Sequence, residues 1–352
     1  MTSLMSARTE RLDKGGNAGQ EPTARLGFRA RLTDHLSVAV GTEQGLFAIR
    51  DGETDGPYFS GCEVSAFLQI GDRCYAGAAS ATDDPVVYVS QDRGLTWNLG
   101  EPIRVAFPEG SGRAVDRVTQ LQVDNSTGPP TSGAPSEDLR PAILATSDPA
   151  ALFRSLDDGN TFDLAYDFCA GGDSSTDSQR PIAVLHSLLT HRARPGRIVV
   201  GILGAGVFRS GDGGATFQAS NGDLPAEGAY VSRIALDPSY PDRLWARTGA
   251  GTYRSDDAGD SWAPAAPGTV GGHDDGPVVG AALGWSEVTE SVPHAGANYA
   301  VLGEAFTAGE DSPFPLAFGT QAGEVFASLD GGITWRRTAS GLPPVLCVRV
   351  LG

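Results

Sequence analysis

The sequence predicts an all-β protein, a six-bladed β-propeller of four-stranded antiparallel blades, because one structural unit recurs along its 352 residues. The clearest part of the unit is a box with the pattern Ser-x-Asp-x-Gly-x-Thr/Ser-aromatic, found at 90–97, 155–162, 210–217, 255–262 and 328–335. A strand, a glycine-bearing turn and a second strand form another part, at 40–47, 200–208, 246–253 and 318–326. No stretch has the periodicity of a helix.

The innermost strand of each unit is expected where apolar and polar residues alternate at period two, a pattern that favours strands. These segments lie at 64–69, 118–124, 182–189, 231–237 and 278–285. Each unit is then predicted to contain four strands, with the glycine-bearing turn between the second and third strands and the box between the third and fourth. This is a four-stranded meander of the kind that makes a propeller blade.

The first blade has a degenerate box at 46–59 and no innermost strand before Leu36. The chain ends in an apolar strand at 345–351, at the point where every other unit begins its innermost strand. We therefore predict that this last strand completes the first blade, which joins the ends of the ring and removes an open sheet edge. The alternative is seven blades, with one more blade hidden within 260–326.

The box itself is predicted to be structural. Its aspartate is suited to accept backbone N–H groups within the turn, and its glycine supplies the positive φ of a tight reversal. The box aromatics are expected to fill the gaps between blades. The residues concerned are Asp92, Asp157, Asp212, Asp257 and Asp330, with Trp97, Trp262 and Trp335 as the largest aromatics.

Composition narrows the classes of partner. The chain has 43 Asp and Glu against 26 Lys and Arg, a formal net charge of −17, and its only lysine is Lys14. We expect no nucleic-acid binding, since that needs a basic surface patch, and no membrane span.

Four scattered cysteines favour free thiols, with a Cys62–Cys74 bridge as the alternative. No metal or cofactor motif occurs, so neither is expected.

The domain organisation follows from the extent of the repeat. Residues 36–352 are predicted to form one propeller domain. Residues 1–35 contain arginines but no apolar core of a secretory signal, and we expect a flexible tail on a cytoplasmic protein. The segments 125–135 and 263–276 lie outside the repeat, as exposed loops or as a lid.

The five boxes and their spacing resemble those of Asp-box (BNR-repeat) β-propellers, the sialidase-like superfamily that includes sialidases, xyloglucan hydrolases, sortilin-type receptors and a photosystem assembly factor. The resemblance covers 36–352. It implies that the boxes lie on the blade perimeter, away from a catalytic centre. For a sialidase, the resemblance would also imply an arginine triad, with the first arginine in a Phe/Tyr-Arg-Ile-Pro motif. The nearest stretch here, at 28–31, is Phe-Arg-Ala-Arg, so no catalytic residue is carried over.

A binding site is predicted at the axial mouth, on the face opposite the boxes. In a meander blade the turns between second and third strands and the connections between blades share that face. Loops on a rigid scaffold are where function concentrates. The candidate residues are Glu63, Arg113, Asp116, Arg117, Arg180, Tyr230, His273, Asp274 and Asp275. Arginines with carboxylates suit an anionic ligand or acid–base chemistry, and solvated loop charges are the alternative.

Three functions fit these observations. The leading hypothesis is a non-hydrolytic binding or assembly module that holds a protein partner, small molecule or glycan at the mouth. The runner-up is an enzyme of glycosidase, lyase or cyclase type that uses Arg with Asp or Glu in the axial pocket. A purely structural subunit is the third, and it predicts a large apolar patch on one face.

Overall fold

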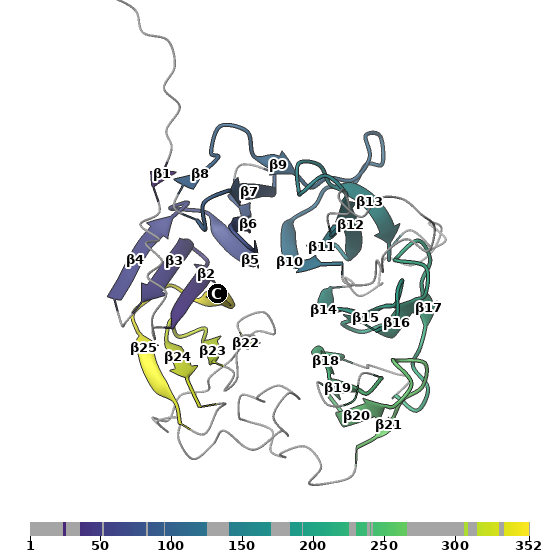
Figure 1. The fold of residues 1–352 in the computed structure, drawn as a ribbon. Coiled ribbons are helices and arrows are strands. Elements are labelled where there is room, and N and C mark those ends of the chain that lie inside the picture. The colour runs from purple at the N-terminus through teal and green to yellow at the C-terminus, as the bar shows by residue number, and fades with distance from the viewer. Residues whose placement is uncertain are drawn as a thin grey trace, which may run out of the picture.

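The computed structural model describes residues 24–25, 36–50, 53–81, 84–94, 96–124, 141–169, 184–191, 193–224, 230–237, 240, 242–265, 306–308, 315–330 and 334–351. These residues form six four-stranded antiparallel sheets around a common centre and no helix (Figure 1). The predicted all-β, six-bladed propeller is thereby confirmed. Residues 266–305, where a seventh blade would have to lie, are outside the described residues.

The blades follow one another along the chain, and blades 2 to 6 contain their strands in sequence order from the centre outward, whereas blade 1 takes its innermost strand from the C-terminal end of the chain. Blade 1 contains β26 (Val345–Leu351), β2 (Ser37–Thr42), β3 (Gly45–Arg50) and β4 (Glu53–Tyr58). Blade 2 contains β5 (Glu63–Ile70), β6 (Arg73–Ala79), β7 (Val86–Ser90) and β9 (Ile103–Arg104). Blade 3 contains β10 (Arg117–Val123), β11 (Ile143–Asp148), β12 (Ala151–Ser155) and β13 (Asp163–Asp167).

The second half repeats this arrangement. Blade 4 contains β14 (Leu185–Thr190), β15 (Ile198–Ile202), β16 (Gly206–Ser210) and β17 (Gln218–Ala219). Blade 5 contains β18 (Arg233–Leu236), β19 (Leu244–Thr248), β20 (Gly251–Ser255) and β21 (Ala263–Pro264). Blade 6 contains β22 (Phe306–Ala308), β23 (Leu316–Gly319), β24 (Val325–Ser328) and β25 (Arg336–Ala339). A further pair joins β1 (Ala24–Arg25) to β8 (Thr96–Trp97) at the rim of blade 2.

The C-terminal strand closes the ring, as predicted. β26 pairs antiparallel with β2, so that Val350 lies opposite Val38 and Val348 lies opposite Val40. The two ends of the propeller therefore share one sheet. β26 thereby covers the edge that β2 would otherwise leave open.

The core lies between the blades. Five buried apolar clusters are present among the described residues, and each draws its side chains from two neighbouring blades. Trp97 belongs to the cluster between blades 1 and 2, and Trp262 belongs to the one between blades 4 and 5. Because each blade is packed on both faces, its middle strands are nearly continuous runs of apolar residues. A strand packed on one face only would instead alternate between apolar and polar residues.

Side chains on the innermost strands also link neighbouring blades through hydrogen bonds. In each case a side chain donates to a backbone carbonyl of the next blade's innermost strand. The links are Cys347 Sγ to Val64 O (3.7 Å), Ser65 Oγ to Val118 O (2.7 Å), Gln120 Nε2 to His186 O (3.0 Å) and Ser187 Oγ to Ile234 O (3.4 Å). These bonds set the relative height of adjacent blades around the axis, and so align the strand ends that form the mouth.

The boxes share one hydrogen-bond pattern. In all five the serine hydroxyl donates to aspartate Oδ1, at 2.7–2.8 Å. The Thr or Ser four residues after the aspartate donates its backbone N–H to Oδ1 and its hydroxyl to Oδ2. Gly94, Gly159, Gly214 and Gly259 have φ of 77–90°. The turn therefore satisfies its own polar groups.

Acid is expected to weaken the boxes. Hydrogen bonds from Thr216 and Thr334 lower the pKa of Asp212 and Asp330 from 3.8 to about 2. A carboxyl whose folded-state pKa is depressed stabilises the fold above its unfolded-state pKa, and this contribution is lost as pH falls from 3.8 toward 2. We expect Asp212→Asn to lower the urea midpoint at pH 7 and the difference from wild type to shrink by pH 2. A pH-independent difference would contradict a role for the charge.

Two further features bear on the sequence-based predictions. All four cysteines are free thiols, so the alternative Cys62–Cys74 bridge is not formed, and burial raises the pKa of Cys74 to about 12. No helix among the described residues is long and apolar enough to span a membrane. The predicted tail at 1–35 lies, apart from Ala24–Arg25, outside the described residues.

Candidate functional site

A cavity of about 250 Å³ opens where the innermost strands of blades 2, 3 and 4 begin. Its lining includes Glu63, Arg117, Thr119, Asp148, His186 and Leu346, from β5, β10, β11, β14 and β26. Asp148 belongs to the turn between the second and third strands of blade 3, and the others lie at or near the starts of innermost strands. The cavity is therefore on the face predicted to hold the axial mouth. We refer to it as the mouth pocket.

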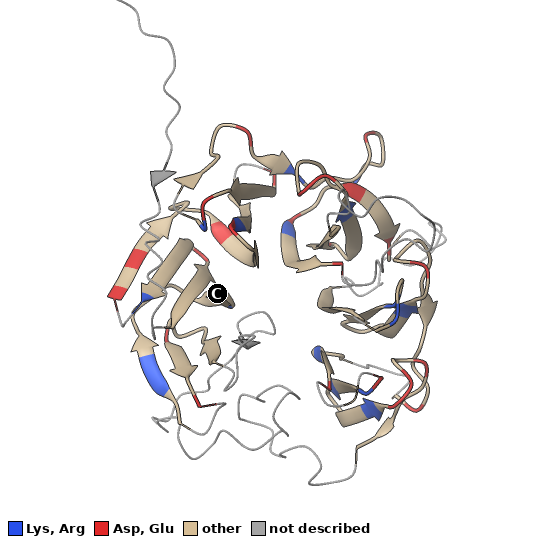
Figure 2. Cartoon of the chain, in the orientation of Figure 1, with Lys and Arg blue, Asp and Glu red and all other residues tan. Residues whose placement is uncertain are grey.

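Arg117 lies at the centre of the charged groups in the mouth pocket. Its Nη1 lies 3.0 Å from Glu63 Oε1, and its Nε lies 3.7 Å from Asp148 Oδ2. The ladder between β10 and β11 places Arg117 directly opposite Asp148, and the adjacent blade brings Glu63 to the same guanidinium. Figure 2 shows an acidic part at the beginning of β5 and a basic part at the beginning of β10.

Asp148 is a largely buried carboxyl of the mouth pocket whose pKa is shifted by its surroundings. Its side chain is 14% exposed, and its Oδ1 is buried without a hydrogen-bond donor among the described residues. Burial raises its pKa, and the neighbouring Asp116 raises it further, whereas Arg117 and His186 oppose that shift. Burial also lowers the pKa of His186, so that imidazole is neutral at pH 7. A buried carboxyl oxygen without a donor costs free energy, so Asp148, which lines the cavity, has unused capacity to accept a hydrogen bond.

The structure brings together some of the sequence-predicted candidates. Glu63 and Arg117 line the mouth pocket, and the backbone N–H of Asp116 donates to Asp148 O at 2.7 Å. Arg113 lies apart, paired with Asp167 at the end of β13 and with its guanidinium 4.1 Å from the Phe107 ring centroid.

The other candidates do not line this cavity among the described residues. Tyr230 precedes β18 in blade 5, and 55% of it is exposed. Arg180, His273, Asp274 and Asp275 lie outside the described residues, as do 125–135 and most of 263–276.

Sequence reasoning missed Asp148 and His186. The stretch Ser147-Asp148-Pro149 has the composition of an ordinary tight turn, and the spacing of His186 from His191 draws attention only to a metal pair, which a strand does not support. A signal for Asp148 was present, since turns between second and third strands were predicted to face the mouth. The two histidines lie at opposite ends of β14, which separates them.

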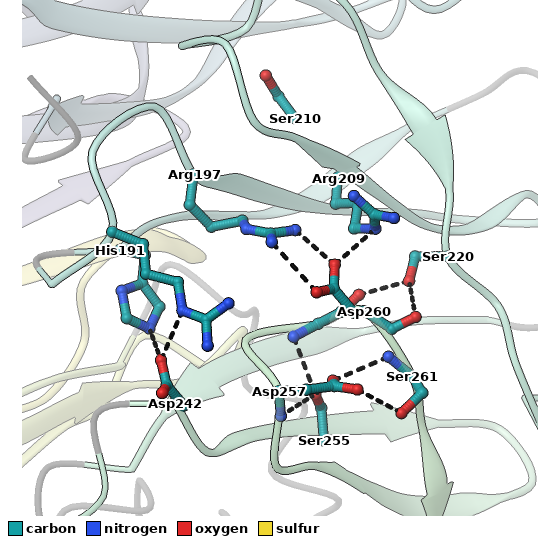
Figure 3. Close-up of polar contacts among 12 residues, drawn as sticks. His191, Arg197, Arg209, Ser210, Ser220, Asp242, Ser255, Asp257, Asp260 and Ser261 are labelled. Atoms are coloured by element: carbon teal, nitrogen blue, oxygen red, sulfur yellow. Dashed lines mark hydrogen bonds and ion pairs between the residues drawn. The ribbon is translucent and has the colours of Figure 1, made fainter.

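A second polar cluster joins blades 4 and 5 on the box face (Figure 3). Arg197 makes two contacts with Asp260, at 2.8 and 3.3 Å, and Arg209 Nε lies 3.0 Å from the same carboxylate. Arg194 Nε donates to Asp242 at 2.7 Å. The Ala193 N–H donates to Nδ1 of buried His191, whose Nε2 faces Asp242 at 3.6 Å. The charges pair with one another, so we assign the cluster to blade packing.

A larger hollow of about 790 Å³ lies at the rim between the outer strands of blade 2 and the box of blade 3. Its walls include Thr96 and Trp97, which pair with β1 of the same chain.

No group of three or more potential metal ligands occurs among the described residues. The exposed large hydrophobics of that part of the chain, Leu156, Tyr230, Tyr240 and Leu329, are spread over three blades and form no common patch.

The sequence matches no protein-family profile and no curated protein. Similar solved structures include a Bacteroides uniformis protein provisionally described as a 6-phosphogluconolactonase, with 12% identity, a TM-score of 0.54, and coverage of 91% of this chain and 100% of that one. YCF48 bound to D1 peptide has 15% identity, a TM-score of 0.43, and coverage of 90% and 83%.

The GH74 enzyme of Niastella koreensis has 18% identity, a TM-score of 0.47, and coverage of 85% of this chain and 43% of that one. This chain therefore spans less than half of the GH74 protein. Identities this low carry information on the fold alone. The six sheets and the order of their strands define the class of the protein as a six-bladed β-propeller.

Proposed function

We propose that this propeller is a binding or assembly module that holds a segment of a partner protein at the mouth pocket and does not hydrolyse it. The observation that carries the proposal is the mouth pocket itself, a cavity of about 250 Å³ lined by Glu63, Arg117 and Asp148, in which the buried Oδ1 of Asp148 has no donor among the described residues. Leaving such an atom unsatisfied costs about 1–3 kcal/mol, more for a charged group. A ligand that supplies the donor recovers that free energy.

The arrangement of the carboxyl groups supports binding without hydrolysis. Two-carboxyl hydrolysis needs one carboxyl as a proton donor and another to attack or to activate water. Glu63 and Asp148 instead face one guanidinium, and Glu63 is held by it at 3.0 Å. The ion pair occupies part of the hydrogen-bonding capacity of these carboxyl groups, and the remaining acceptor positions suit ligand recognition.

The proposal is tested by selecting peptides from a random library on the purified protein. Leu346→Trp fills the mouth pocket, and Leu156→Trp places the same side chain on a box leucine that is 77% exposed. We expect selected peptides to bind wild type and Leu156→Trp, to lose about tenfold or more in affinity for Leu346→Trp, and to be recovered intact. Equal binding to all three folded proteins, cleavage of the peptides, or selection of none would each overturn the proposal.

An enzyme is a second candidate because the pKa of Asp148 is raised beside a neutral histidine, a combination found at acid–base sites. Glycoside and uronate substrates incubated with wild type and with Asp148→Asn test this candidate. Turnover that Asp148→Asn abolishes would replace the binding proposal with an enzymatic one. Turnover that is equal in both would exclude this residue as the acid or base.

We further propose that the chain is an Asp-box (BNR-repeat) propeller of the sialidase-like superfamily, without the sialidase catalytic motif. The support is the common hydrogen-bond pattern of its five boxes. An alignment of its homologues in which the box serine and aspartate do not recur would contradict this assignment.

A further inference from the structure

The mouth pocket also has a charge and a shape that select the chemistry of its ligand. Resting on the proposed binding function, we infer that the mouth pocket takes one cationic side chain, an arginine or lysine, from the partner segment. The ligand charge inferred here is opposite to the one expected from the sequence, in which arginines at the mouth suggested an anionic ligand.

The charge of the mouth pocket is the first argument. Two carboxyl groups, Glu63 and Asp148, face the guanidinium of Arg117, and a third, the exposed Asp116, lies close enough to act on Asp148 electrostatically. His186 adds no positive charge because its imidazole is neutral at pH 7. The surroundings are therefore net negative when the carboxyls are ionised. An anion placed there would meet more repulsion than attraction, whereas a cation would be attracted.

The acceptors are the second argument. Asp148 Oδ1 is buried and without a donor among the described residues, and Arg117 approaches the other oxygen only to 3.7 Å. The strongest donor to a carboxylate is itself charged, because charge-assisted hydrogen bonds are about twice as strong as neutral ones. A guanidinium or ammonium group that reaches the Asp148 carboxyl from the cavity meets this need.

The size and walls of the cavity are the third argument. Its volume of about 250 Å³ is below the range of roughly 300–1,000 Å³ typical of small-molecule sites. It therefore suits one side chain, with the rest of the ligand lying outside. Val184, Leu185 and Leu346 give it apolar walls, against which the methylene stem of arginine or lysine can pack while its head reaches Asp148. A bare metal ion would gain nothing from such walls.

Proton linkage gives the site a pH dependence. A bound cation favours the ionised form of Asp148, whose pKa is raised in the free protein. Affinity is therefore expected to rise with pH through the raised pKa of the free carboxyl and to fall as the solution becomes more acidic. Arg117 and Asp116, at the start of β10, and His186, from β14, act directly on this carboxyl. Glu63, from β5, acts on it indirectly, because it pairs with Arg117.

The test uses synthetic peptides that carry one arginine among glycines and serines, and matched peptides with citrulline, the uncharged isostere. Binding to the full chain is measured by calorimetry or NMR. We expect the arginine peptide to bind wild type about tenfold or more tightly than the citrulline peptide. Asp148→Asn should remove most of that preference. Arg117→Gln should strengthen arginine binding, because it removes a competing cation, while Leu156→Trp should leave it unchanged.

Several outcomes would overturn the inference. Equal binding of arginine and citrulline peptides, or loss of binding in Arg117→Gln while that variant retains its fold, would show that the site does not select a cation. Arginine binding that appears only in Arg180→Ala would show that the chain's own arginine is the occupant. Library peptides that bind at the mouth pocket without enrichment in arginine or lysine would refute the inference and leave the proposed function standing, whereas absence of any mouth binding would refute both.

Discussion

Removal of residues 345–351 is expected to abolish cooperative folding. β26 pairs with β2 along its length, and its residues belong to two of the interblade clusters. Val345 and Val348 pack between blades 6 and 1, and Cys347 packs between blades 1 and 2. All three are fully buried. Losing one buried aliphatic side chain costs about 2–5 kcal/mol when it is truncated to alanine, and a domain is stable by only about 5–15 kcal/mol.

The truncated chain would also expose β2 as an open edge, which promotes association with other chains. Thermal unfolding followed by circular dichroism, together with gel filtration, measures both effects. A variant that lacks only Gly352 is the control and is expected to unfold like wild type. Addition of a synthetic peptide of residues 345–352 is expected to restore part of the transition. A truncated chain with an unchanged melting temperature would show that the ring does not depend on this strand.

Gly159→Ala is expected to destabilise the protein by about 2–5 kcal/mol, from left-handed backbone strain of about 1–2 kcal/mol and overpacking of about 1–3 kcal/mol. Gly159 has φ of +80°, and a Cβ there would lie 2.5 Å from Tyr75 Cε1. Tyr75 cannot move away easily, because it is 1% exposed and its hydroxyl donates to Asp158 O at 3.0 Å. The box glycine of blade 3 thus packs directly against blade 2.

Gly211→Ala is the matched control, since it makes the same substitution within another box. Gly211 has no positive φ, and no atom lies within 4 Å of the place that a Cβ would occupy, so its substitution should change stability by less than about 0.5 kcal/mol. Urea denaturation of the two variants measures the difference. Equal midpoints would indicate that the box turn adapts to a side chain and does not clamp neighbouring blades.

The comparison between sequence and structure separates two kinds of interaction. The boxes, the role of 345–351 and most strands follow from patterns that recur within a few residues of one another. The innermost strand of blade 6 is an exception, since it was predicted at 278–285 and is formed by Phe306–Ala308. A strand is recognised from a short alternating or continuous apolar run, and a box turn satisfies its own hydrogen bonds through residues two and four positions apart. Repetition of such local patterns also determines that neighbouring units must stack, because no single blade buries its own faces.

The mouth pocket depends on interactions that no local pattern specifies. Glu63 and Arg117 were predicted because the starts of innermost strands face the mouth, yet Arg113, also predicted, is held away by Asp167 and Phe107. Asp148 is distinguished by burial, which follows from the packing of three blades.

The sequence by itself thus determined the blade, its turns and the closure of the ring, because these depend on local hydrogen bonding and on the periodicity of apolar residues. Only the tertiary structure decided which charges meet. The reason is physical: whether a carboxyl finds a partner depends on strand register and blade height, and the pairs that result join residues far apart in the chain, as Glu63 and Arg117 do.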